Sequence, residues 1–226
     1  MLYALAHPLS LLVLVVSFVV GLTAHGVVQA AVASRLGSRR VILEGRTKPD
    51  PRHHLDPFGA VAALLSGLGW VRPVEPPVGR RRGPALLVTL VGPAVNVLAG
   101  VGLLLAWRVA YGPGDAFPGG AAYELQHGWS VDAAPGALLL LAGASQLYLG
   151  VLSLVPLPPL DGGQLLFALA PRTHGWLRAE HQLVERNIGV AVLLALLVIP
   201  LGGPVPILPQ LLDVVLDPVL SLLLGA

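Results

Sequence analysis

The chain has 226 residues, of which 55% are hydrophobic and 12% are charged, and its formal net charge is +2. About a quarter of the residues of a soluble domain are charged, so this composition excludes an ordinary soluble protein and indicates a polytopic membrane protein. The absence of cysteine excludes disulfides and thiolate metal ligands, and so small a net charge gives no indication of nucleic acid as a partner.

Several apolar runs approach the roughly 20 residues that a helix needs to cross a bilayer. We predict spanning helices over 9–33, 84–107, 135–155 and 188–201, and a last apolar stretch at 207–224 that either spans the membrane or lies in its interface. The segment 55–71 is apolar but short and interrupted by glycine, which favours a re-entrant or interfacial segment. The predicted fold is all-α: one polytopic transmembrane helix bundle over 1–226, set in the lipid bilayer.

The basic residues are distributed unevenly along the chain. Ten of them lie between Arg35 and Arg82, whereas the stretch 108–132 contains one. Because lysine and arginine accumulate on the cytoplasmic side of membrane proteins, we predict that the loop 35–83 is cytoplasmic and the N-terminus is outside. The predicted location is the cytoplasmic membrane of a bacterium.

Two polar side chains lie deep in the first predicted helix. His25 and Gln29 are four residues apart and therefore share one helix face. His25 precedes the charged end at Arg35 by ten residues, so at about 1.5 Å per residue it lies about 15 Å from that end, well inside the hydrocarbon. Such groups usually face a bundle interior, where they make hydrogen bonds between helices or form a functional site.

A second unusual stretch, SLVPLPPLDGGQLL, runs from Ser153 to Leu166. Its prolines exclude a regular helix through 156–159, and Asp161 follows directly. Irregular backbone at membrane depth is tolerated only inside protein or beside a water-filled cavity. Asp161 can therefore cap the next helix or act as a carboxylate ligand of a metal.

Four stretches together resemble the site-2 protease family of intramembrane zinc metalloproteases (peptidase family M50), in its compact bacterial branch without a PDZ domain. HGVVQAAVASRLG at 25–37 is similar to the family's H-E-x-x-H helix, and GPAVN at 92–96 to its G-P-x-x-N motif. PLPPLDGG at 156–163 is similar to its proline-rich L-D-G signature, and the stretch 53–76 resembles an insert of this branch. The resemblance covers about 9–170 and leaves the C-terminal helices, about 187–226, outside it.

The resemblance implies a role for each matching position. In the family, the two histidines of H-E-x-x-H and the aspartate of L-D-G hold zinc, and the glutamate is the general base. His25 and Asp161 stand at ligand positions, but Gln29 replaces the second histidine and Gly26 replaces the glutamate. Since a carboxamide is a poor substitute for an imidazole ligand and glycine has no side chain, we expect zinc and peptidase activity to be lost or severely reduced.

Two other residues are candidates for the site. His54 can act as a third metal ligand if the segment 55–71 brings it to His25, or it can be an ordinary interfacial histidine. Asn96 can orient a substrate backbone or a water molecule, or it can make a hydrogen bond between helices.

Three functions remain open from the sequence. The first is a catalytically impaired protein that binds a transmembrane substrate or a partner protein. The second is an active intramembrane metalloprotease with a zinc site rebuilt from His25, Asp161 and His54. The third, a small transporter component, is disfavoured because no internal repeat is visible.

Overall fold

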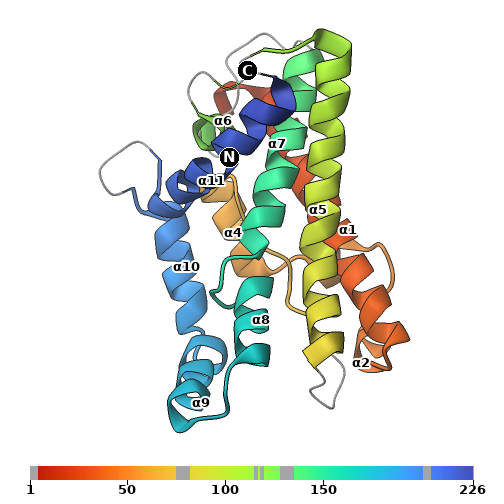
Figure 1. The fold of residues 1–226 in the computed structure, drawn as a ribbon, viewed down its shortest axis with the longest axis vertical. Coiled ribbons are helices and arrows are strands. Elements are labelled where there is room, and N and C mark those ends of the chain that lie inside the picture. Colours follow the sequence, from red (N-terminus) through yellow and green to blue (C-terminus); the bar gives the residue numbers. More distant parts are fainter. Residues whose placement is uncertain are drawn as a thin grey trace.

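Three long helices form the centre of the molecule (Figure 1). The computed structural model describes residues 5–74, 82–114, 117, 120–127, 135–200 and 205–225. α5 (Arg82–Tyr111) and α7 (Pro135–Ser153) run side by side along the long axis, and α1 (Pro8–Arg35) crosses behind them. The largest cluster of buried apolar side chains fills the space between these helices and their shorter neighbours.

Shorter helices surround this centre. They are α2 (Arg40–Leu43), α3 (Pro51–His54), α4 (Pro57–Ser66), α6 (Ala121–His127), α8 (Asp161–Leu169), α9 (His174–Glu180), the π-helical turn η2 (His181–Glu185), α10 (Ile188–Val198) and α11 (Ile207–Leu224). Figure 1 shows α2 and α9 at the lower end of the bundle and α6 and α11 towards the upper end.

The predicted all-α membrane fold is confirmed. Four helices among the described residues are long and apolar enough to cross a membrane: Pro8–Arg35, Gly83–Tyr111, Gly136–Ser153 and Ile207–Leu224. The stretch 188–201, predicted to span the membrane, does not form a helix long enough to span it alone. Its helix α10 has 11 residues and reaches the length of a span only together with the preceding helical segment, from which it is bent by 65°.

The apolar segment 55–71 folds back on itself, in agreement with the predicted re-entrant form. Its helix α4 has ten residues, about half the length of a span, and the backbones of Leu55 and Val71 meet in an isolated antiparallel bridge. α4 begins at Pro57 after Asp56, whose carboxylate accepts the N–H groups of Phe58 and Gly59. The segment therefore enters and leaves the bundle at the same place.

The prolines after α7 interrupt the helix as predicted. α7 ends at Ser153 and α8 begins at Asp161, with the intervening residues folded in turns. The break allows α8 to start inside the bundle and to pack against α5. Asp161, the first residue of α8, is thus buried inside the bundle and not exposed to water.

Candidate functional site

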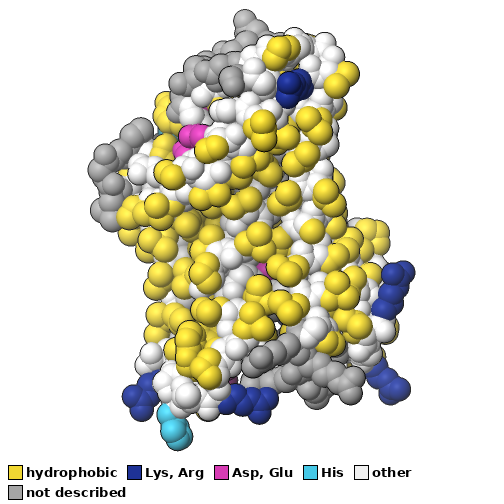
Figure 2. Space-filling view, in the orientation of Figure 1, with side chains coloured by type: hydrophobic (Ala, Val, Ile, Leu, Met, Phe, Trp, Pro, Cys, Tyr) yellow, Lys and Arg dark blue, Asp and Glu magenta, His cyan; other side chains and the backbone are white. Residues whose placement is uncertain are grey.

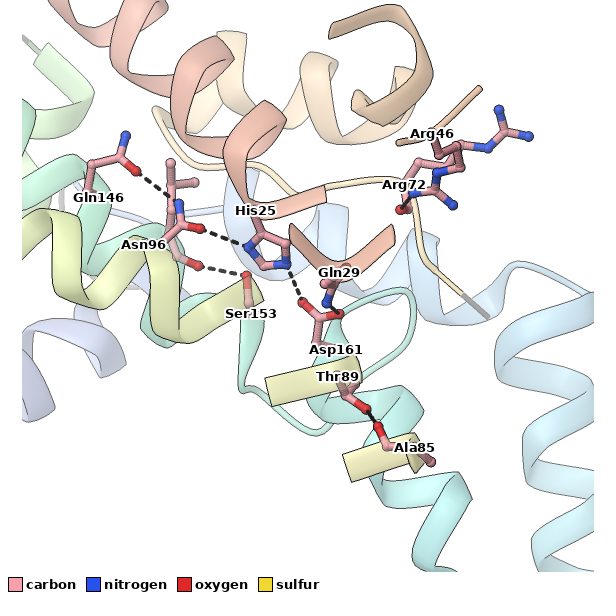
Figure 3. Close-up of polar contacts among 11 residues, drawn as sticks. His25, Gln29, Arg46, Arg72, Ala85, Thr89, Asn96, Gln146, Ser153 and Asp161 are labelled. Carbon is pink, nitrogen blue, oxygen red and sulfur yellow. Dashed lines mark hydrogen bonds and ion pairs between the residues drawn. The ribbon is translucent and has the colours of Figure 1, made fainter. Parts of the chain in front are cut away.

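Three helices, α1, α5 and α8, bring four polar side chains together at one point (Figure 3). Nε2 of His25 lies 3.0 Å from Oδ2 of Asp161, and Nε2 of Gln29 donates to Oδ1 of Asp161 over 2.7 Å. Nδ1 of His25 lies 2.9 Å from Oδ1 of Asn96. All four side chains are buried, with His25 and Asn96 fully excluded from solvent. The structure thus brings together four of the residues that the sequence indicated.

The hydrogen bonds continue beyond Asn96 and fix the tautomer of His25. Gln146 donates from Nε2 to the backbone carbonyl of Ser17 over 2.6 Å, and a carbonyl can only accept. Oε1 of Gln146 therefore accepts from Nδ2 of Asn96 over 2.9 Å, which turns Oδ1 of Asn96 towards His25. It follows that Nδ1 of His25 is the donor in the contact with Asn96.

The same reasoning determines what holds His25 and Asp161 together. With Nδ1 already donating, a hydrogen bond between Nε2 and Asp161 requires one more proton, which either the ring or the carboxyl group carries and donates. Asp161 is the first residue of α8, while the cap position is Leu160, so the carboxylate turns to α1 instead of capping α8. The two groups therefore satisfy each other inside the bundle.

The sequence did not indicate the roles of Gly92 and Gln146. A Cβ added at Gly92 would overlap the ring of His25 and lie 2.9 Å from Cδ of Gln29, so this glycine permits the close approach of α5 to α1. Gln146 joins α7 to the hydrogen-bond chain. The available signal was a glutamine within an apolar span, which costs free energy unless it finds partners in the bundle.

His54 lies against α1 at the position that lacks the glutamate. A Cβ added at Gly26 would overlap Nδ1 of His54 and lie 3.0 Å from its Cγ. Nε2 of His54 donates to the carbonyl oxygen of Lys48 over 3.0 Å, and the buried Nδ1 has no hydrogen-bond partner among the described residues. Burial lowers the pKa of His54, which keeps the ring neutral. The imidazole thus fills the space where a side chain at residue 26 would begin.

The donor set does not fit a zinc centre with three protein ligands. In the part of the chain that the structure describes, no three His, Asp or Glu side chains converge as a metal-binding group. Gln29 presents its amide nitrogen to Asp161, and an amide nitrogen is a donor without a lone pair for a metal. Catalytic zinc normally has three protein ligands and water, whereas His25 and Asp161 supply two.

A comparison with curated proteins finds a relative that matches most of the chain. The chain is 36% identical over 209 residues to the "Putative zinc metalloprotease YwhC" of Bacillus subtilis (strain 168). This alignment covers 88% of this chain and 86% of the relative. The chain belongs to the site-2 protease family. No family model and no solved structure matches it.

In this site-2 protease family member, Gly26 should tolerate no side chain. We expect Gly26→Ala to lower the free energy of unfolding by about 1–3 kcal/mol, because the added methyl group must displace the ring of His54. The matched control is Gly102→Ala in α5, where an added Cβ meets nothing within 4 Å and the gain in helix propensity is up to about 1 kcal/mol. Thermal unfolding in detergent measures both, and equal effects would contradict the packing of His54 on α1.

Proposed function

We propose that this member of the site-2 protease family binds transmembrane segments of other proteins without cleaving them. The observation that supports this most directly is the hydrogen bond from the Gln29 amide to Asp161. It occupies the carboxylate with a donor from the position where the family has a histidine ligand. The zinc that the family's activity requires is therefore not part of the proposed function.

Besides the histidine ligand, the chain lacks the family's general base at residue 26. Gly26 offers no group that can take a proton from water, and the neighbouring His54 fills the space without joining His25 and Asp161. Peptide hydrolysis needs an activated water molecule and a proton acceptor beside it. What remains is a hydrogen-bond chain that joins α1, α5, α7 and α8, which suits a rigid binding scaffold.

A groove of about 440 Å³ supports the binding role. It lies between α1, α5 and α7, and its exposed lining is almost entirely apolar. Small residues of α1, Gly21 and Ala24, form part of its wall, as is usual where transmembrane helices pack closely. Ser17 and Gln146 belong both to this groove and to the hydrogen-bond chain, so a segment bound there would lie next to the polar site.

The test combines crosslinking with a cleavage assay in vesicles. A photoreactive residue at Val20, an exposed residue of the groove wall, is expected to crosslink to a synthetic single-span peptide. The matched control is Val109, which is exposed on α5 and outside the groove. The peptide should carry a central Gly-Pro pair, because a helix-breaking sequence is the most sensitive probe for residual cleavage.

We expect crosslinking at Val20, none at Val109, and intact peptide by mass spectrometry with or without a chelator. Chelator-sensitive cleavage that Asp161→Ala abolishes would overturn the proposal and establish an active protease instead. Equal crosslinking at both positions would show that the groove is not a binding site.

A further inference from the structure

The helical segment 174–185, formed by α9 and η2, is only partly covered by the rest of the described chain. Neither α9 nor η2 contains a buried residue. Among its apolar side chains, Trp176, Leu177 and Val184 are exposed by 36, 45 and 47%. Apolar side chains that the protein itself leaves exposed over a helix face mark contact with a partner or a membrane.

The direction of this segment suits a membrane surface. It is bent by 65° from α10, which runs roughly along the long axis of the bundle (Figure 1). The segment therefore lies across the end of the bundle instead of continuing through it. Helices that lie in the membrane–water interface have this direction, across the bundle axis.

Exposed apolar side chains lie on both sides of this bend. Val184 of η2 is 47% exposed, and Ile188 and Val192, one turn apart on α10, are 42 and 39% exposed. Figure 2 shows apolar side chains over much of this face of the molecule, down to its lower end.

Basic residues outnumber acidic ones in both segments at this end, by ten to four in 35–82 and by three to two, Glu180 and Glu185, in 172–186. Thirteen of the 14 basic residues of the sequence lie in two segments, ten in 35–82 and three in 172–186. The three in the second segment, Arg172, Arg178 and Arg186, are exposed. Arginine and lysine side chains gather at the lower end in Figure 2, where α9 lies. Basic groups next to membrane helices attract anionic lipid headgroups by about 1 kcal/mol each.

We propose that α9 and η2 form an interfacial helix that binds anionic lipids. Trp176 and Val184 lie among the acyl chains, and Arg172, Arg178 and Arg186 contact headgroup phosphates. Trp176 also packs edge-on against Phe167 of α8, with ring centroids 6.1 Å apart. Because α8 begins at Asp161, anchoring of this segment holds the helix that carries the carboxylate of the site.

The test uses the absence of cysteine from the chain, which lets one introduced cysteine carry a spin label alone. Val184→Cys reports on the apolar face, and Gln182→Cys, two residues away, reports on the opposite face. The full chain is placed in vesicles of phosphatidylcholine with or without phosphatidylglycerol. Collisions with oxygen and with a water-soluble nickel complex then measure the depth of each label.

In the anionic vesicles, the label at residue 184 should collide with nickel several-fold less often than the label at residue 182. Replacing Arg172, Arg178 and Arg186 by glutamine, or omitting phosphatidylglycerol, should reduce this difference. Equal nickel access at both positions would overturn the interfacial placement. Protection that does not depend on phosphatidylglycerol would overturn lipid-charge recognition, and protection that appears only at high protein-to-lipid ratio would indicate a second copy of the chain.

Discussion

Changing Gln29 to histidine is expected to give the chain a zinc site, which we propose that the unchanged chain lacks. The new imidazole would lie four residues after His25 on the same face of α1, beside Asp161. Three protein ligands would then face one point, which is the usual number in catalytic zinc sites. The zinc content of detergent-purified protein, measured by elemental mass spectrometry, should rise from a trace to about one ion per chain.

The control for this experiment removes the carboxylate from the same variant. Gln29→His combined with Asp161→Asn should return the zinc content to that of the unchanged chain. Gln29→His alone is not expected to restore cleavage, because residue 26 still lacks a base and His54 occupies its space. One zinc ion per unchanged chain, lost with Asp161→Ala, would instead show that two ligands and Gln29 suffice.

The sequence predicted those parts of the fold and the site that depend on local pattern. Apolar length predicted the long helices, and three prolines predicted the break that precedes Asp161. The family resemblance predicted that His25, Gln29, Asn96 and Asp161 meet, and the structure places all four within one hydrogen-bonded group. Pairings implied by a family pattern carry over even where the ligand chemistry has changed.

The parts that the sequence did not predict depend on packing between distant segments. Gln146 and Ser17 are 129 residues apart, and no periodicity indicates that one donates to the carbonyl of the other. The position of His54 depends on how 46–74 folds back onto α1, which hydrophobicity alone does not determine. The span predicted at 188–201 is a shorter helix that ends at Val198 and is bent by 65° from the segment before it, because apolar composition does not show where a helix bends or ends.

Removing the carboxylate by Asp161→Ala is expected to destabilise the fold more than any other single change in the site. The change leaves Nε2 of His25 and the amide of Gln29 buried without their hydrogen-bond partner. Removing one partner of a buried pair costs about 3–5 kcal/mol where that pair is charged, against about 0.6 kcal/mol for an average hydrogen bond between membrane helices. The matched control is Asp217→Ala, because that carboxylate is exposed on α11.

A double-mutant cycle separates the pair from its surroundings. Replacing His25 and Asp161 together by leucine should cost less than the sum of the two single changes, because neither group is then left unpaired. Additive losses of unfolding free energy in detergent would show that the 3.0 Å contact contributes little. A chelator distinguishes the two origins of such coupling. If a proton joins His25 to Asp161, the chelator should not change the free energy of unfolding of the unchanged chain. If a metal ion joins them, the chelator should lower that free energy as the single substitutions do.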